Sequence, residues 1–227
     1  MNSTIDRVIN SANAFYSEAK KDKNHRYHSW EHCYKCFHDA RNNPEADIDY
    51  LSLMLAYYLA SWGMYRGSSF LLKKDYKVHV PVVTEVLKPK YDVLLDLKCK
   101  DLRNKNTQEA LETLGFKIST YYVNIRADVK DDDIKKDSSS TLVTKILMGT
   151  LGCVPAYDRF FVDGVKDQKV STGNYNMKSL LRLAEFYELN EAVLEKARKR
   201  FKAYDYQYPQ MKILDMGFWQ IGYEKSK

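Results

Sequence analysis

The stretch Asp47-Ile-Asp-Tyr-Leu-Ser-Leu-Met-Leu-Ala-Tyr-Tyr-Leu-Ala-Ser-Trp62 is strongly apolar, and it decides the expected fold. Its large side chains recur at helical spacing, at Leu51, Leu55, Tyr58, Leu59 and Trp62. Asp47 is a suitable N-cap, because its carboxylate can accept a hydrogen bond from a free backbone N–H of the first turn. We therefore expect a helix over 47–62 and predict that it forms the centre of the core.

The composition of the whole chain favours helices as well. The 227 residues include only nine glycines and five prolines, and no stretch alternates apolar and polar residues for long enough to indicate a sheet. An aromatic fraction of 13% argues against disorder. We predict an all-α fold, with residues 1–227 forming a single compact domain of about eight to ten helices. The serine-rich and aspartate-rich loop 129–140 is the candidate subdomain boundary.

Charge and cysteine content narrow the function classes. The net charge of +6 permits a polyanionic partner such as nucleic acid without requiring one. The four cysteines have no disulfide-framework spacing, the Met-Asn-Ser start lacks the pattern of a signal peptide, and no apolar run is long enough for a membrane span. We expect a cytoplasmic protein with no membrane association. The sequence assigns no cofactor and no oligomeric state.

Four of the five histidines lie in one stretch, His25-Arg-Tyr-His-Ser-Trp-Glu-His-Cys-Tyr-Lys-Cys-Phe-His-Asp39. If a helix begins near His28, one apolar stripe contains Trp30, Cys33, Tyr34 and Phe37. We expect this stripe to pack on the helix over 47–62. The opposite face contains His28, His32 and Asp39, which are either a solvated polar face or a metal site, since two imidazoles at i and i+4 can bind one divalent ion.

Arg26 followed by His32 resembles the Arg-to-His motif of HEPN ribonucleases, which are small all-helical proteins. The resemblance implies metal-independent RNA cleavage with Arg26 and His32 as the catalytic residues. A histidine can move a proton near neutral pH while an arginine binds phosphate charge, so the two residue types suit this chemistry.

Arg26-Tyr27-His28, followed by Trp30 and His32, resembles the opening of small HD-domain phosphohydrolases. In that family the next helix carries a His-Asp doublet, whereas Tyr57 to Trp62 contains none. The resulting alternative is a metal-dependent phosphohydrolase that uses His28, His32 and Asp39. A further alternative, from another class, is a non-catalytic helical binding module.

The corner Ser61-Trp-Gly-Met-Tyr-Arg-Gly-Ser-Ser69 is a candidate phosphate-binding site. Gly63 or Gly67 can adopt positive φ there, and a serine can cap the following helix. We assign Arg66, Ser68 and Ser69 to phosphate binding, because free amides and a guanidinium suit an anion. The alternative is an ordinary C-cap turn that carries a surface arginine.

The stretch Thr141 to Phe161 predicts an apolar helix, the turn Gly149-Thr-Leu-Gly152, and a second helix that begins at Pro155. This arrangement resembles the helix-hairpin-helix of DNA-binding proteins and helical glycosylases, in which hairpin amides face a phosphate. The resemblance implies Lys145 or Asp158 as a nucleophile or an activating carboxylate. Otherwise Asp158 pairs with Arg159 or caps a helix.

Three blocks together resemble a bacterial family of hypothetical proteins: Ser29-Trp-Glu-His-Cys33, Tyr58-Leu-Ala-Ser-Trp-Gly-Met-Tyr-Arg-Gly-Ser68, and Thr144-Lys-Ile-Leu-Met-Gly-Thr-Leu-Gly-Cys-Val-Pro-Ala-Tyr-Asp158. That resemblance implies no activity. From the residues, the leading hypothesis is nucleic-acid or nucleotide phosphate binding or processing.

Overall fold

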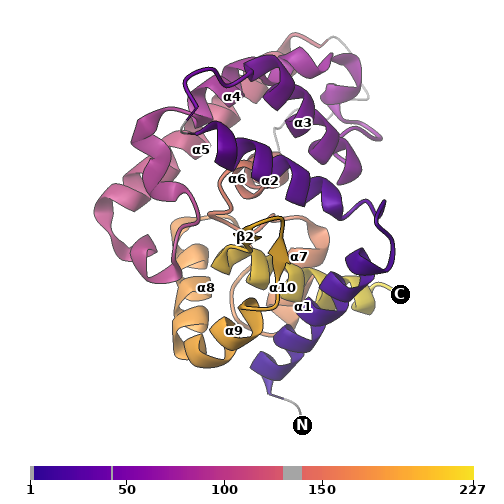
Figure 1. Ribbon diagram of the computed structural model, residues 1–227, viewed down its shortest axis with the longest axis vertical. Coiled ribbons are helices and arrows are strands. Elements are labelled where there is room, and N and C mark those ends of the chain that lie inside the picture. Colours follow the sequence, from indigo (N-terminus) through magenta and orange to yellow (C-terminus); the bar gives the residue numbers. More distant parts are fainter. Residues whose placement is uncertain (1–2, 42, 130–139) are drawn as a thin grey trace.

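The computed structural model describes residues 3–41, 43–129 and 140–227, and within these ranges the chain is helical (Figure 1). The α-helices are α1 (Thr4–Lys21), α2 (His28–Ala40), α3 (Ile48–Ser61), α4 (Val80–Val86), α5 (Lys105–Ala127), α6 (Ser140–Thr150), α7 (Arg159–Asp167), α8 (Met177–Leu189), α9 (Glu191–Arg198) and α10 (Gln210–Lys225). Short 3-10 helices join α3 to α5, namely η1 (Phe70–Lys73), η2 (Tyr76–His79), η3 (Pro89–Leu94) and η4 (Cys99–Arg103). The predicted all-α fold is confirmed, while most of the loop 129–140 lies outside the described residues.

Side-chain caps explain where α1 and α3 begin. The Ser3 side chain accepts a hydrogen bond from the backbone N–H of Asp6, whose carboxylate bonds back to Ser3 in a capping box. The Asp47 side chain accepts from the backbone N–H of Tyr50 and starts α3, as predicted. Both signals depend on residues only three positions apart, so the sequence alone contains them.

Helices α2 to α5 form the upper half of the molecule in Figure 1, α1 and α7 to α10 form the lower half, and α6 lies between the halves. The apolar stripe of α2 is buried at Trp30, Tyr34 and Phe37, and α2 packs against α3 as predicted and also against α6. Buried side chains from Val8 to Ile221 form a single hydrophobic cluster that spans both halves.

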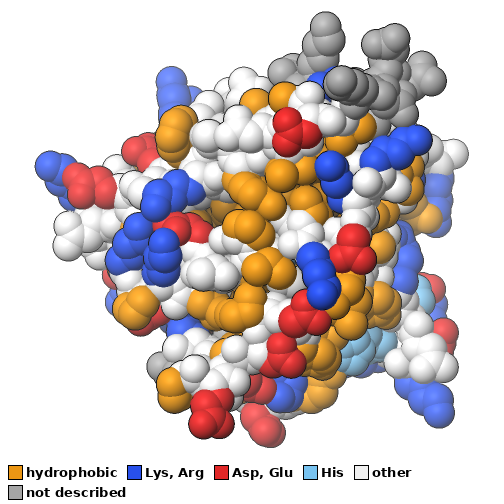
Figure 2. Space-filling view, turned by 90° about the horizontal axis from the view of Figure 1, so that it is seen from above, with side chains coloured by type: hydrophobic (Ala, Val, Ile, Leu, Met, Phe, Trp, Pro, Cys, Tyr) orange, Lys and Arg blue, Asp and Glu red, His pale blue; other side chains and the backbone are white. Residues whose placement is uncertain are grey.

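The prediction that the 47–62 helix forms the centre of the core is wrong. Helix α3 remains about half exposed at Tyr50, Leu53 and Tyr57, and hydrophobic side chains appear among charged ones on the upper surface of the molecule (Figure 2). By contrast, α6 is buried at every residue from Leu142 to Thr150, and α10 at every residue from Gln210 to Trp219. Apolar composition did not distinguish these helices, because burial depends on how many neighbours cover each helix.

The structure also contains a small antiparallel hairpin, which the sequence pattern did not predict. Strands β1 (Lys202–Ala203) and β2 (Tyr206–Gln207) pair antiparallel between α9 and α10. Helix α9 ends at Arg198, and Tyr204 adopts a positive φ of 53° in the turn of the hairpin.

In the described parts of the chain, no helix combines the length and apolarity needed to span a membrane.

Candidate functional site

A cavity of about 600 Å³ lies between the C-terminal turn of α3, helix α6, the start of α7 and helix α10. Aromatic side chains form much of its wall, at Trp62, Tyr65, Phe160 and Trp219. Four cationic side chains and a single carboxylate also belong to its described lining, namely Arg26, Arg66, Lys145, Arg159 and Asp158. The cavity is therefore both aromatic and electropositive.

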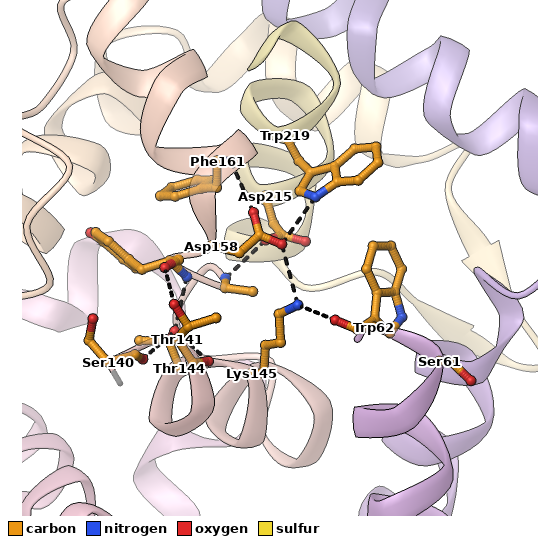
Figure 3. A network of polar contacts seen from close by, with 12 residues as sticks. Ser61, Trp62, Ser140, Thr141, Thr144, Lys145, Asp158, Phe161, Asp215 and Trp219 are labelled. Carbon is orange, nitrogen blue, oxygen red and sulfur yellow. Dashed lines mark hydrogen bonds and ion pairs between the residues drawn. The ribbon is translucent and has the colours of Figure 1, made fainter. Parts of the chain in front are cut away.

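Lys145 lies at the buried end of this cavity, with only 4% of its surface exposed. Its Nζ donates a hydrogen bond to the backbone oxygen of Trp62 at 2.8 Å and lies 3.3 Å from Asp158 Oδ2 (Figure 3). Burial lowers the pKa of Lys145, and the neighbouring Asp158 carboxylate only partly opposes this effect. The amine therefore loses its proton more readily than an exposed lysine.

Asp158 is held in place by α7 and α10 (Figure 3). It is the N-cap of α7, where its Oδ1 accepts a hydrogen bond from the backbone N–H of Phe161 at 3.1 Å. Its Oδ2, which faces Lys145, also accepts from Trp219 Nε1 at 3.2 Å. The prediction that Asp158 caps a helix is confirmed, and its ion pair is with Lys145.

The segment before Asp158 is not helical, so the prediction that a helix begins at Pro155 is wrong, and α7 begins at Arg159. The backbone of Tyr157 bonds to two threonines of α6, with N–H donating to Thr144 Oγ1 and the carbonyl accepting from Thr141 Oγ1, each at 2.9 Å. The backbone N–H of Ala156 donates to Asp215 Oδ1 at 2.9 Å. Side chains from α6 and α10 thus replace helical hydrogen bonds and bring Asp158 opposite Lys145.

Behind the cavity, α10 contributes a second buried ion pair. Lys212 Nζ lies 2.8 Å from Asp215 Oδ2, and both side chains are less than a tenth exposed. The same amine faces the rings of Phe15 and Trp30, with centroid distances of 5.3 and 4.8 Å. Asp215 therefore has the partner that its apolar surroundings require, and it also holds the backbone of Ala156 in the segment before α7.

Three arginines lie at the exposed edge of the cavity. Arg26 Nη1 donates to the backbone oxygen of Ser61 at 2.9 Å, and its guanidinium is 5.2 Å from the ring centroid of Trp62. Arg159 lies over Phe160 at 4.6 Å. Within the described residues, no carboxylate forms an ion pair with Arg26, Arg66 or Arg159, so their charges remain available to an anion.

Arg66 reaches the cavity because of the turn that follows α3. Gly63 and Gly67 both adopt positive φ, at 75° and 57°, as the sequence predicted for this corner. The Arg66 side chain lies across Gly63, where a β-carbon would be 2.9 Å from Arg66 Nε. Ser69 caps the short helix η1 by accepting from the backbone N–H of Leu71, whereas Ser68 and Ser69 are both absent from the described cavity lining.

The predicted catalytic pair Arg26 and His32 does not meet at this cavity. Arg26 lines it, but His32 lies outside its described lining and pairs through Nδ1 with the Tyr204 hydroxyl of the β1–β2 turn. Burial lowers the pKa of His32. Arg26 and Arg66, from two separately predicted sites, are instead brought together.

The three predicted metal ligands each have another partner. His28 Nδ1 lies 2.5 Å from Glu31 Oε2, His32 pairs with Tyr204, and Asp39 pairs with Lys35 and Tyr206. Among the described residues, no group of three or more histidine, cysteine, aspartate or glutamate side chains is arranged to hold a metal ion.

The glycine turn that resembles a helix-hairpin-helix is buried. Gly149 lies inside α6, where a β-carbon would be 2.5 Å from Tyr58 Cε1. Gly152 adopts a φ of 66° at the end of α6, and its N–H donates to the carbonyl of Leu147 at 3.1 Å. These glycines serve helix packing and termination, so the hairpin amides do not face a phosphate.

Fold and site together define an all-helical protein with a basic, aromatic cavity. No family model, no curated protein and no solved structure matches the chain. The sequence motifs did not identify four residues of the described lining, Thr141, Arg159, Phe160 and Trp219, as site residues, and no local motif connects these four to the corner after α3. Only the packing of α10 against α7 and α1 brings Trp219 to Asp158.

Proposed function

We propose that the protein binds a nucleotide unit, either free or within a single-stranded nucleic acid, in the cavity between α3, α6, α7 and α10. The observation that carries the proposal is the convergence of three arginines without carboxylate partners, among the described residues, on a cavity walled by four aromatic side chains. Its volume of about 600 Å³ is in the range of small-molecule sites.

The two halves of a nucleotide match the two kinds of lining residue. Guanidinium groups bind phosphate through paired, charge-assisted hydrogen bonds, and Arg26, Arg66 and Arg159 lie at the exposed edge where a phosphate remains partly solvated. A base is planar and can stack on an aromatic ring, which Trp62, Tyr65 or Phe160 provides. The net charge of +6 supports attraction of such an anion.

The proposal concerns binding and assigns Arg26 to the phosphate. It does not include RNA cleavage by Arg26 and His32, because His32 contacts Tyr204 outside the described cavity lining. A proton transfer between a histidine and a bound substrate requires contact or one bridging water.

Calorimetry with AMP, a single-stranded oligonucleotide and inorganic phosphate tests the proposal. We expect Arg66→Ala to weaken binding of AMP or the oligonucleotide about tenfold, the effect of losing one hydrogen bond to a charged group. Arg200→Ala is the matched control, since Arg200 is exposed and lies outside the described cavity lining. Equal losses of affinity in both variants indicate nonspecific attraction. If none of the three probes binds, the proposal is refuted.

The probes also separate the two sources of the nucleotide unit. Tighter binding of the oligonucleotide than of AMP, with a steeper salt dependence, identifies nucleic acid as the ligand. Equal binding of the two identifies the single nucleotide. Binding of inorganic phosphate as tight as that of AMP contradicts a role for the aromatic wall.

A further inference from the structure

Helix α3 has an exposed aromatic stripe outside the cavity. Tyr50, Leu53 and Tyr57 are each about half exposed. Because they are three and four residues apart, their side chains lie on one face of the helix. Ala60 is exposed as well and continues this face into the last turn. Adjacent exposed apolar side chains mark a binding surface more often than single ones do, so the stripe is a candidate for ligand contact.

The stripe opens directly into the cavity. Ala60 and Ser61, in the last turn of α3, belong to the described cavity lining. The Ser61 hydroxyl donates to the Tyr57 carbonyl at 2.9 Å, one turn back along the helix. With a rise of about 1.5 Å per residue, Tyr57 lies about 6 Å and Tyr50 about 17 Å from Ser61 along the axis. A ligand that leaves the cavity at this edge therefore meets Tyr57 first and Tyr50 second.

Arg26 lies where the stripe and the cavity meet. Its Nη1 donates to the Ser61 carbonyl at 2.9 Å, and its guanidinium lies 5.2 Å from the ring centroid of Trp62. Arg26 is itself exposed, and within the described residues no carboxylate forms an ion pair with it. A guanidinium at this junction suits the phosphate that joins a nucleotide in the cavity to the next nucleotide outside. The base of that next nucleotide is then beside Tyr57.

We propose that the stripe on α3 binds the nucleotides that follow the one in the cavity, so that the ligand is a single-stranded nucleic acid. The inference rests on the proposed function and selects the strand over the free nucleotide. A free nucleotide ends inside the cavity and leaves the stripe uncovered, whereas a strand continues onto it. Stacking on tyrosine tolerates any base, because every base has a π face. The strand is therefore bound with little dependence on its sequence.

The charges at the two ends of the stripe set its length. Arg26 attracts phosphate at the cavity end, whereas Asp47 and Asp49 begin α3 next to Tyr50 and disfavour a further phosphate. The path from Ala60 to Tyr50 is about 15 Å long, and a strand rises at least about 3.4 Å per nucleotide. The stripe therefore accommodates at most about four nucleotides beyond the one in the cavity.

Calorimetry with AMP and a six-nucleotide single-stranded oligoadenylate tests the inference, because the oligonucleotide is long enough to occupy cavity and stripe together. We expect Tyr57→Ala to weaken binding of the oligonucleotide about tenfold, the effect of losing one stacked base. Binding of AMP is expected to stay unchanged, since Tyr57 lies outside the described cavity lining. Position 57 is exposed and alanine is a strong helix former, so the variant keeps its fold.

Two further variants separate stacking from other effects. Tyr57→Phe keeps the ring and is expected to bind the oligonucleotide as the wild type does. Phe116→Ala is the matched control, because Phe116 is an exposed aromatic residue of α5 outside both the stripe and the described cavity lining. Equal losses of affinity in Tyr57→Ala and Phe116→Ala overturn the inference.

The remaining outcomes distinguish this inference from the proposed function. If Arg66→Ala weakens AMP binding but Tyr57→Ala leaves oligonucleotide binding unchanged, the inference is refuted and the proposed function stands. If neither probe binds the wild type, both are refuted. If sedimentation shows a dimer that Tyr57→Ala dissociates, while oligonucleotide affinity is unchanged, the stripe binds a second copy of the chain and the inference is refuted.

Discussion

Asp158→Asn tests the ion pair at the buried end of the cavity. Asparagine keeps an oxygen that can cap α7, but it removes the charge that faces Lys145 Nζ at 3.3 Å and presents an amide donor to Trp219. The Lys145 side chain is 5% exposed and the Asp158 side chain 16%, so water compensates poorly for the missing partner. Breaking a buried pair by removing one partner costs about 3 kcal/mol or more of the free energy of unfolding.

A double-mutant cycle with Lys145→Met isolates that interaction. Methionine fills similar volume without a charge, so the double variant no longer contains an unpaired buried ammonium group. We expect it to be more stable than the sum of the single losses predicts, by about 2 kcal/mol. Urea denaturation at neutral pH measures all four free energies of unfolding.

The free energies of unfolding measured in this cycle depend on pH in a defined direction. Burial already lowers the pKa of Lys145 below its ordinary value of 10.5, and loss of Asp158 removes a charge that raises it. Between the folded pKa and 10.5 the unfolded chain binds more protons, so stability rises with pH in that window. The defect of Asp158→Asn is therefore largest near neutral pH and shrinks as the pH approaches 10.5.

Two results refute this reasoning. If Asp158→Asn lowers the free energy of unfolding by less than about 1 kcal/mol at neutral pH, the Lys145–Asp158 pair contributes no more than a solvent-screened surface pair. Strict additivity in the cycle shows that the two side chains do not interact across the cavity.

Three further predictions concern stability. Gly149→Ala places a β-carbon 2.5 Å from a buried tyrosine ring and is expected to lower the free energy of unfolding by about 2 kcal/mol. Gly115→Ala meets only ordinary contacts within α5 and is expected to raise it by about 0.5 kcal/mol. Urea denaturation that shows equal effects for the two variants contradicts this packing. Burial lowers the pKa of His79 from 6.5 to about 4, so its stabilising contribution is complete above pH 6.5 and is lost as the pH falls toward 4. Thermal unfolding of His79→Gln across that range is expected to show a flatter pH dependence than the wild type, and an unchanged slope rules out His79 as the source. Asp47→Ala is expected to cost about 1 kcal/mol in thermal unfolding and Asp47→Asn little, because only alanine removes the cap of α3; equal losses contradict that role.

Much of the helical framework was predictable from local patterns. The caps Ser3 and Asp47 and the turn glycines Gly63 and Gly67 act within a few residues of themselves, so their outcome does not depend on the rest of the chain. The hairpin near Tyr204 was not predictable in this way. Its two-residue strands are too short for an alternating pattern, and a positive φ at tyrosine is uncommon without tertiary support.

The candidate site was predicted only in part, because local patterns do not show which segments meet after folding. Arg26 and Arg66 were identified from motifs beside helix ends, and both line the cavity. His32 was identified from its spacing to Arg26, but its place on α2 directs it to Tyr204. Spacing along a chain shows which residues share a helix face, and it does not show what that face contacts.

The sequence by itself determined the fold class, the start of α3 and the apolar stripe of α2, because each follows from propensity, capping or periodicity within one segment. Only the tertiary structure decided that α6 and α10, rather than α3, are enclosed by other helices. It also decided that Lys145, Asp158 and Trp219 meet, since they come from three elements that lie together only after packing. A buried ammonium group is stabilised by a fixed carboxylate beside it, and the Lys145–Asp158 pair exists only in the packed chain.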